Sequence, residues 1–387
     1  MLILCISTAF ISSGQGVITP ILPIFAQQLN ISISSIGFAV SIFAFARLIF
    51  NFPIGFIADK IGRRPLLIIG PIINAFGILL TGFSFNLFFL LFSRFISGIG
   101  HGMYTIAALA YISDISDDSN RAKYIGMNQV ALLTGVAIGP AIGGILAELY
   151  GLRMPFYVIS IVVASTSIYS LLKLPETFND NKNKKVKDDN KKKLFFKLLK
   201  SRKFFSIALI TISIFFTRQG SRNTIIPLLA TTKLNITTGQ LGIIFTLQAI
   251  IHLLTLIPAS LAADKFGRRS VIIPSALGTA IFLLFFIISH SIVIFLIASI
   301  LVSITMALAG PAPAAFVVDI APKEITGMAM SLYRTAGDIG FVIGPPLLGY
   351  IADAYSLEMS LFINSILILL AVSYFFIYGK EGKDLTL

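Results

Sequence analysis

Residues 55–64 read Gly-Phe-Ile-Ala-Asp-Lys-Ile-Gly-Arg-Arg, and residues 260–269 read Ser-Leu-Ala-Ala-Asp-Lys-Phe-Gly-Arg-Arg. Each stretch follows a long apolar run and precedes another. The glycine before the two arginines permits a tight turn, and the arginines stand where anionic head groups or acidic side chains can meet them. A loop motif that occurs twice indicates that the chain is built from two similar halves.

The offset of 205 residues that aligns the two motifs also aligns other positions. Leu29-Asn30-Ile31-Ser32 falls on Leu234-Asn235-Ile236-Thr237, Asp114 on Asp319, and Gly139-Pro140 on Gly344-Pro345. One offset that holds over so long a stretch is not coincidence. With six membrane spans in each half, both halves keep the same orientation, which predicts a parallel repeat about an axis normal to the membrane.

The composition is that of a membrane protein. Apolar residues make up 56% of the chain and charged residues 12%, whereas soluble proteins carry about 25% charged residues. Apolar runs of about 20 residues recur from end to end, and each can span a bilayer core of about 30 Å. The chain opens on such a run with no basic leader and no cleavage site, so we expect a first span and not a signal peptide. The single cysteine, Cys5, excludes an internal disulfide.

We therefore predict an all-α membrane protein with twelve transmembrane helices in two six-helix bundles. The expected spans lie near residues 2–27, 36–57, 66–84, 87–113, 124–149, 153–173, 203–231, 239–261, 270–289, 291–318, 325–351 and 357–378. Residues 1–173 form the first bundle, 174–202 a basic cytoplasmic linker, and 203–387 the second bundle. We expect the linker to be disordered up to about Lys193, because it is rich in lysine and poor in apolar residues. From Lys191 to Phe205 it is either a basic amphipathic helix on anionic lipid or a solvated linker.

The basic residues predict the orientation. Of the 30 lysines and arginines, 23 fall in one set of alternate loops and ends, and only Arg153 and Lys233 fall in the opposite set. Cytoplasmic loops carry the excess of positive charge, so both termini and the linker are expected in the cytoplasm, with the protein a multi-pass component of the cell membrane. This distribution also accounts for the net charge of +13 without a nucleic-acid partner.

Three further motifs lie inside predicted helices. They are Gly135-x-x-x-Gly139-Pro140-x-x-Gly143-Gly144 in the fifth span, Gly14-x5-Pro20-Ile21-Leu22-Pro23 in the first, and Arg94-x-x-Ser97-Gly98-x-Gly100 in the fourth. Glycine and proline at such positions let helices approach closely and kink.

Together these motifs resemble the major facilitator superfamily. The repeated loop motif matches its cytoplasmic signature, with Ser260 in place of the first glycine in the second copy. The motifs of the fifth and first spans are similar to those of the superfamily's twelve-helix drug:proton antiporters. The motif of the fourth span resembles a pattern whose arginine is linked to proton transfer, with Ser97 in place of a glutamine.

The resemblance implies two six-helix bundles around a central cavity lined by helices 1, 4, 7 and 10, with helices 2, 5, 8 and 11 between the halves. It implies that the loop motif locks the cytoplasmic side shut, with Asp59 bound near the start of helix 11 and Arg63 able to reach Asp114. The residues expected in this gating loop are Gly55, Asp59, Lys60, Gly62, Arg63, Arg64, Asp114, Asp264, Lys265, Gly267, Arg268 and Arg269.

Six charged residues fall well inside predicted spans, away from the span ends, where each costs about 2.5–3.5 kcal/mol on insertion scales. They are candidates for the substrate or proton pathway: Arg47, Arg94, Arg218, Arg222, Arg334 and Asp338. Arg218 and Arg222 share a helix face. They either form a cationic cavity for an anionic or polar substrate or pair with backbone carbonyls and snorkel. Asp338 either couples transport to protons by changing partner between Arg334 and Arg47, or stays in a permanent ion pair.

Uncharged polar residues inside spans have two interpretations as well. Gln15, Asn51, Gln129, Asn223 and Gln248 either bind substrate or join helices by hydrogen bonds. His101 and His252 either carry protons or pack as neutral imidazoles.

The predicted function is secondary active transport of a small molecule by alternating access, as proton-coupled efflux. Helix 1 carries no acid, which weakens a cation-efflux interpretation, and an importer or facilitator of a small organic anion is the alternative; a receptor or channel is more distant. The chain contains no nucleotide-binding loop, no metalloprotease helix and no Ser/His pair, so we expect no enzyme activity, no cofactor and no metal. The expected partners are the substrate, protons and membrane lipids, and the expected state is a monomer.

Overall fold

The structure is a computed structural model that describes residues 1–117, 120–177, 189–322 and 325–380. The chain divides into two compact units. Unit 1 consists of Met1–Asn183 with Ala230–Ala249, and unit 2 consists of Lys184–Leu229 with Ile250–Leu387. Each unit is described by itself below.

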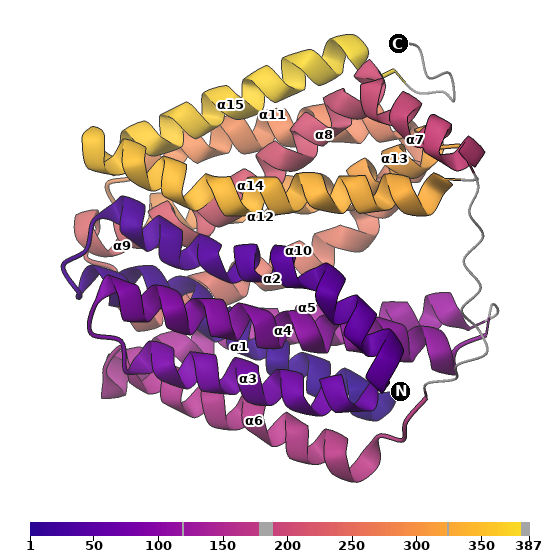
Figure 1. Ribbon diagram of the computed structural model, residues 1–387. Coiled ribbons are helices and arrows are strands. Elements are labelled where there is room, and N and C mark those ends of the chain that lie inside the picture. The colour runs from indigo at the N-terminus through magenta and orange to yellow at the C-terminus, as the bar shows by residue number, and fades with distance from the viewer. Residues whose placement is uncertain (118–119, 178–188, 323–324, 381–387) are drawn as a thin grey trace. The chain divides into compact units, whose positions relative to one another are not determined.

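Unit 1 is a bundle of helices from the first half of the chain. It holds α1 (Leu2–Gln27), α2 (Ile33–Ile61), α3 (Arg64–Gly82), α4 (Leu87–Ile115), α5 (Arg121–Tyr150) and α6 (Met154–Lys173), with the first part of α10 (Thr238–Phe266). Figure 1 shows α3 between α4 and α6, and α1 packs along α5.

Unit 2 repeats this packing with helices from the second half. Its helices are α7 (Asp189–Lys200), α8 (Arg202–Phe216), η2 (Thr217–Ile225), the first half of α9 (Ile226–Lys233), the second part of α10, α11 (Arg268–Ile287), α12 (Ile292–Leu308), α13 (Pro311–Ile320), α14 (Thr326–Ala354) and α15 (Leu357–Tyr378). Here α11 packs on α12 and α15, and α14 packs on α8 and η2 (Figure 1). These contacts correspond to those of α3 with α4 and α6, and of α5 with α1, so the sequence repeat is also a repeat of helix packing.

The helices account for twelve membrane spans, which confirms the predicted fold class. Within the described residues, eleven spans are long and apolar enough to cross a membrane; α8, η2 and α9 form one of them, and α12 and α13 form another. The twelfth span is α14, which is long enough at 29 residues. It is less apolar than the others because it carries Arg334, Asp338 and Asp353 together with several glycines.

Two details correct the sequence-based boundaries. The first half of each loop motif is helical, because α2 runs to Ile61 and α10 to Phe266; nothing breaks either helix before Gly62 or Gly267. In addition, α7 begins at Asp189, within the stretch predicted to be disordered, since lysine is a good helix former. Within that stretch, residues 178–188 lie outside the described part. Lys323 and residues 381–387 also lie outside it.

The repeated Asn-Ile-Ser/Thr sequence forms the turns that precede α2 and α10. Asn30 has φ +55° and Asn235 has φ +51°, a left-handed conformation that asparagine tolerates better than most residues. Oγ of Ser32 then accepts from the backbone N–H of Ser35 at 3.2 Å, and Oγ1 of Thr237 accepts from that of Gln240 at 3.2 Å. These hydroxyls therefore cap the following helices.

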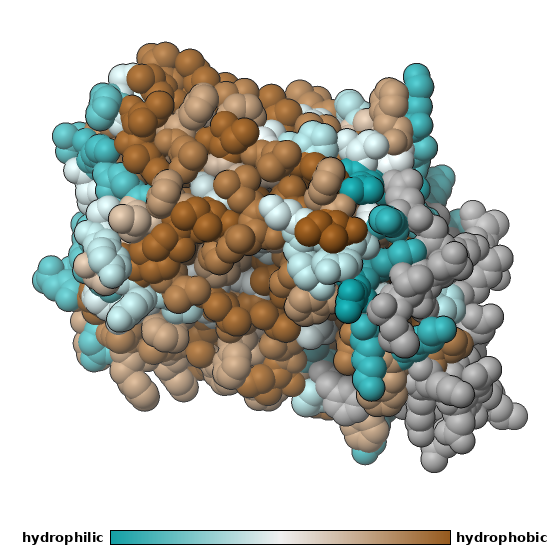
Figure 2. Space-filling view, turned by 90° about the horizontal axis from the view of Figure 1, so that it is seen from above, coloured by the Kyte–Doolittle hydropathy of each residue, from teal (hydrophilic) through white to brown (hydrophobic). Residues whose placement is uncertain are grey.

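The outer surface carries the apolar side chains expected of a protein in lipid. Figure 2 shows a face with hydrophobic side chains across its middle and hydrophilic ones toward its ends. On α15, Phe362, Ile366 and Leu370 are 46%, 40% and 62% exposed. Soluble monomers rarely expose apolar surface continuously along a helix, so these faces fit contact with lipid chains.

Candidate functional site

The turn between α2 and α3 holds a group of charged residues that we call the first arginine cluster: Arg63, Arg64, Asp114 and Glu176. Gly62 makes the turn with φ +94°, a backbone conformation that residues other than glycine rarely adopt. A Cβ at this position would also lie 2.5 Å from Oε2 of Glu176. The backbone therefore favours glycine at residue 62, and a Cβ there would also displace the end of the Glu176 side chain.

Arg63 joins the turn to the end of α4. Its Nε lies 2.9 Å from Oδ2 of Asp114, and another guanidinium nitrogen donates to the carbonyl of Ala58 at 2.7 Å. The Thr177 hydroxyl donates to the same Asp114 oxygen at 3.1 Å. The side chains of Arg63 and Asp114 are 10% and 22% exposed, so this ion pair is largely shielded from water.

Glu176 joins the segment after α6 to the start of α3. Its two carboxylate oxygens accept from the backbone N–H groups of Arg63 at 3.0 Å and Arg64 at 3.1 Å. Carboxylates are favoured at this position because the first N–H groups of a helix have no partner within it and the helix dipole is positive there. Arg64 in turn donates to the carbonyl of Leu171 at 2.8 Å. The segment after α6 thus holds the turn through both backbone and side chains.

Sequence analysis missed Glu176 and Thr177. Two features of the sequence could have indicated Glu176. It is the first acid after the sixth span, and it lies in a segment expected on the same side of the membrane as Arg63 and Arg64. The expected gating residue Asp59 lies in the last turn of α2, and its side chain is outside the described part. Lys60 is exposed, with Nζ 4.5 Å from the centre of the Phe56 ring. No described atom lies within 4 Å of a Cβ placed on Gly55.

Unit 2 contains the second arginine cluster: Asp264, Arg268, Arg269 and Asp319. Gly267 makes the turn with φ +90°. Arg268 pairs with Asp264 one helical turn earlier, and its Nε lies 3.2 Å from Oδ2 of Asp319. Arg269 donates to the carbonyl of Phe376, and Lys265 lies over the ring of Phe266.

The two clusters are equivalent under the 205-residue offset. Arg64 binds the Leu171 carbonyl and Arg269 the Phe376 carbonyl, and both pairs of residues differ by that offset. The clusters differ in exposure, however, because Asp319 is 53% exposed and Asp114 only 22%. The repeat therefore preserves the contacts more closely than their shielding from water.

The glycines of α5 place its backbone against two helices of unit 1. A Cβ on Gly135 would lie 2.1 Å from the carbonyl oxygen of Ala9, and one on Gly139 would lie 2.6 Å from the backbone nitrogen of Val17. Gly143 makes a similar approach to Val17. Gly135, Gly139 and Gly143 therefore form a flat strip on which α1 packs.

Gly144 and the carbonyl group of Pro140 face α10 instead, whereas the Pro140 ring lies near Gly16 of α1. A Cβ on Gly144 would lie 2.9 Å from the α carbon of Gly242. The backbone N–H of Ala141 donates to Oγ1 of Thr246 at 2.9 Å. Proline in a helix disturbs the hydrogen bonds of its own turn, and here a hydroxyl from a neighbouring helix satisfies one of the affected groups. The α5 motif thus serves two helix contacts, on α1 and α10.

A cationic and aromatic group lies inside unit 1. The guanidinium of Arg94 lies 4.7 Å from the centre of the Phe43 ring and that of Arg47 lies 5.6 Å from it, while the His101 ring centre is 5.4 Å away. Nε2 of His101 lies 3.1 Å from Nε2 of Gln15. Arg94 and His101 are buried, and a cation over an aromatic face is stabilised there more than in water. Ser97 donates to Oδ1 of Asn74 at 2.8 Å, a bond that joins α4 to α3.

Arg218 and Arg222 lie in the π-helix η2, near the middle of the seventh span. Asn364 of α15 holds this helix: its amide nitrogen donates to Oγ of Ser221 at 2.7 Å and to Oγ1 of Thr217 at 3.1 Å. Asn223 donates to Gln219 within η2. Single π-turns occur frequently at functional sites, and this π-helix presents both arginines to a cavity.

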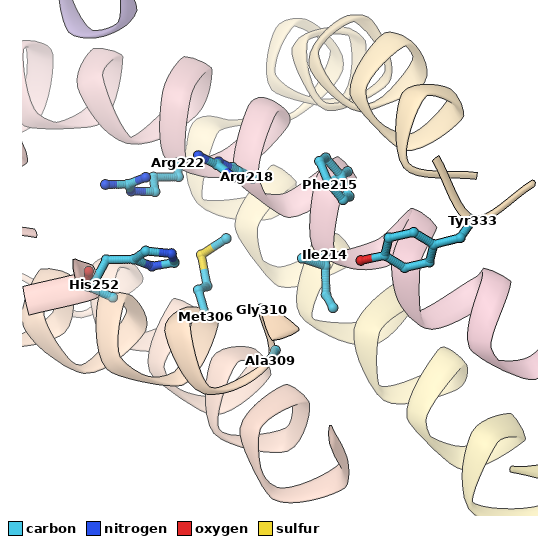
Figure 3. Close-up of a pocket in the computed structure, with 10 residues that line it drawn as sticks. Ile214, Phe215, Arg218, Arg222, His252, Met306, Ala309, Gly310 and Tyr333 are labelled. Atoms are coloured by element: carbon cyan, nitrogen blue, oxygen red, sulfur yellow. The ribbon is translucent and has the colours of Figure 1, made fainter. Parts of the chain in front are cut away.

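We call that cavity the arginine cavity. Its volume is about 100 Å³. The residues that line it are Ile214, Phe215, Arg218, Arg222, His252, Ser303, Met306, Ala309, Gly310 and Tyr333. Figure 3 shows the two arginine side chains next to each other, with His252 and Met306 facing them and Ile214 beside Tyr333. The structure therefore brings Arg218, Arg222 and His252 together.

The remaining pathway candidates lie elsewhere. Asp338 is half-buried and Arg334 is exposed on α14. Asn51 and Gln129 are exposed, whereas Gln248 is buried.

A family model with the description Major Facilitator Superfamily matches residues 4–220 and, a second time, residues 212–386. The chain belongs to the Major Facilitator Superfamily. Two matches to one model also agree with the two-fold repeat. Because the family consists of transporters, the interpretation as a membrane enzyme is excluded.

Relatives within the Major Facilitator Superfamily match along most of the chain. An uncharacterized MFS-type transporter of Methanocaldococcus jannaschii is 29% identical over 91% of this chain and 90% of its own. Multidrug resistance protein 2 of Bacillus subtilis is 25% identical over 91% of this chain and 88% of its own. The crystal structure of a bacterial homolog to the human lysosomal transporter Spinster matches with a TM-score of 0.86 and 15% identity over 98% of this chain and 96% of that one, which supports the shared fold.

Proposed function

We propose that this Major Facilitator Superfamily transporter exports a small solute by alternating access and that protons drive the export. The observation that carries the proposal is the α5 motif, in which Gly135, Gly139 and Gly143 bring the backbones of α5 and α1 into direct contact. It resembles the motif of the superfamily's antiporters. Similarity to a multidrug resistance protein over 91% of the chain also supports export.

In this proposal the two arginine clusters, one at an end of each bundle, are the contacts that hold the gate closed. Each cluster joins a helix-connecting turn to the end of another helix through arginine–carboxylate contacts. Such contacts are directional and can form or break as units, which suits a gate that must open and close in every cycle. The bundles of residues 1–173 and 203–387 then move relative to each other, joined by the linker of residues 174–202.

The proposed coupling residue is Asp338 on α14. It is the single acid predicted well inside a span, and it is half-buried. Burial favours a neutral carboxyl group and a nearby cation favours the carboxylate, so a carboxyl whose surroundings change during the cycle takes up and releases a proton. Positively charged loops place the termini and the linker in the cytoplasm in this proposal.

The experiment that tests export is accumulation in inside-out membrane vesicles that contain the full chain. Vesicles energised by a proton gradient are supplied with a panel of radiolabelled cationic, neutral and anionic aromatic compounds. We expect at least one compound to accumulate, and a protonophore to abolish its accumulation. Accumulation that persists after the gradient is collapsed would exclude proton coupling. If no compound accumulates in inside-out vesicles but one accumulates in right-side-out vesicles, the direction is import and the proposal of export is wrong.

A further inference from the structure

The polar side chains of the arginine cavity are matched to an anionic ligand. Its two guanidinium groups are donors only, and the Tyr333 hydroxyl and the His252 ring can also donate. The ten described residues that line the cavity include no aspartate and no glutamate. A lining of this kind offers hydrogen bonds to an oxyanion, whose oxygens are acceptors, and its two guanidinium groups repel a cationic ligand.

The two arginines lie deep in a membrane span, where a negatively charged ligand would stabilise their positive charges. Arg218 is near the midpoint of the span Arg202–Lys233. A cation at that depth in a span is costly unless a counter-charge or water-filled space compensates it. Arg218 and Arg222 stand on one face of η2 and lie next to each other (Figure 3), so they also repel each other. One bound oxyanion would offset both costs.

The remaining lining is apolar. Its apolar side chains are those of Ile214, Phe215, Met306 and Ala309. In Figure 3, Ile214 and Phe215 lie toward Tyr333, while Arg222 and His252 lie at the opposite end. Methionine adapts its shape to different apolar ligands. The cavity therefore has a cationic end and an apolar end.

We infer that the arginine cavity binds a small amphipathic organic anion. Its carboxylate, sulfonate or phosphate lies on Arg218 and Arg222, and its apolar body lies along Ile214, Phe215 and Met306. The His252 ring faces the arginines (Figure 3). This inference rests on the proposed function, since it names the class of solute that the protein exports.

The test compares three ligands of one shape with different head groups: 1-naphthoate, 1-naphthamide and 1-naphthylmethylamine. Binding to the purified full chain in detergent is measured by isothermal titration calorimetry. We expect 1-naphthoate to bind more tightly than the other two. Arg218→Gln and Arg222→Gln should each weaken it by about tenfold or more, because each removes a charged hydrogen-bond donor. Arg218→Lys keeps the charge but not the two-pronged geometry, so its loss should be smaller.

The matched control is Arg202→Gln. It removes the same charge from the exposed start of the same span, away from the cavity, and should leave 1-naphthoate binding unchanged. Gel filtration checks that each variant is folded, and Arg218→Lys and Arg222→Lys replace any glutamine variant that is not. Equal affinity for the three ligands, or undiminished binding of 1-naphthoate to both folded arginine variants, would overturn the inference.

Transport of the same ligands separates this inference from the proposed function. If inside-out vesicles accumulate 1-naphthylmethylamine but not 1-naphthoate, the export proposal stands and the anion site is wrong. If 1-naphthoate binds in a manner that depends on both arginines but accumulates only in right-side-out vesicles, the site stands and export is wrong.

Discussion

At the scale of single residues, two glycines with the same backbone conformation differ in the space available for an added side chain. Gly62 has φ +94° with ψ 175° and Gly151 has φ +90° with ψ 159°, a region open essentially to glycine alone, so alanine at either position meets a similar backbone penalty of about 1–3 kcal/mol. Only at Gly62 does a Cβ also meet a neighbour, the carboxylate of Glu176; no described atom lies within 4 Å of a Cβ on Gly151. The difference between the two positions therefore isolates the contact with Glu176.

We predict that Gly62→Ala lowers the apparent melting temperature more than Gly151→Ala does. The measurement is thermal unfolding of the purified protein. Adding Glu176→Ala to Gly62→Ala removes the clash, although it also removes the bonds to the N–H groups of α3. The extra loss from Glu176→Ala should therefore be smaller in the Gly62→Ala background than in the natural chain. Equal losses in both backgrounds would mean that Glu176 does not press on residue 62.

The two arginine clusters allow a second comparison at this scale. Removing one partner of a shielded ion pair leaves an uncompensated charge, whereas exposed pairs contribute little, typically about 0–1 kcal/mol. Asp114 is 22% exposed and its partner Arg63 10%, while Asp319 is 53% exposed. We predict that Asp114→Asn lowers both the melting temperature and the transport rate more than Asp319→Asn does. A larger effect of Asp319→Asn on transport would show that the second cluster dominates the gate.

At the scale of helices, α5 is an element whose surface is closely matched to its neighbours. Its glycines are separated into a strip that meets α1 and a position that meets α10. A side chain added to the strip cannot be accommodated by rotating a flexible group, because the neighbouring atoms belong to the backbone of α1.

We predict that Gly139→Ala separates α5 from α1 and reduces transport at least tenfold, since a packed interface resists added volume at a cost of about 1–3 kcal/mol. Gly126→Ala is the control in the same helix, because no described atom lies within 4 Å of its Cβ. It should be neutral or slightly stabilising, as alanine favours helices more than glycine does. Transport in vesicles and melting temperature measure both effects. Normal transport by Gly139→Ala would show that close contact of α5 and α1 is not required.

The helices themselves were largely predictable, because length and apolarity suffice to locate a membrane span. The repeat predicted which motifs correspond, and the contacts of Arg64 and Arg269 follow it. Sequence alone did not predict η2, because a π-helix depends on which neighbours bond to it, here Asn364 from α15. It also missed Glu176, whose role arises from a contact between segments more than 100 residues apart. The cavity around Arg218 and Arg222 was one of two predicted interpretations; its remaining walls come from α12, α14 and the segment around His252.

At the scale of the whole molecule, the orientation in the membrane is open to direct measurement. In a Cys5→Ala background, we expect a cysteine at Ser32 to react with an impermeant thiol reagent in intact cells. A cysteine at Lys200, an exposed residue of α7, should react only after the cytoplasmic face is opened. Each site serves as the control for the other, and labelling of residue 200 in intact cells would reverse the topology.

Proton coupling is also a property of the whole cycle. We predict that Asp338→Asn abolishes accumulation driven by a proton gradient, because the amide cannot carry the proton, while substrate binding and counterflow exchange persist. Inside-out vesicles measure accumulation, and preloaded vesicles without a gradient measure exchange. A folded Asp338→Asn variant that still accumulates substrate along a pH gradient would exclude Asp338 as the coupling residue.

The contact of Glu176 with the start of α3 also has a consequence for biosynthesis. The chain emerges from the ribosome in order, and the turn at Gly62 is made more than 100 residues before the carboxylate that accepts from its N–H groups. During that interval α4, α5 and α6 are synthesised while the first N–H groups of α3 lack this acceptor. The first cluster is therefore completed only when the nascent chain reaches residue 176. In unit 2, Arg269 likewise waits for the carbonyl of Phe376. In each half of the chain, the turn between the second and third spans therefore gains its last contacts only when the end of that half is translated.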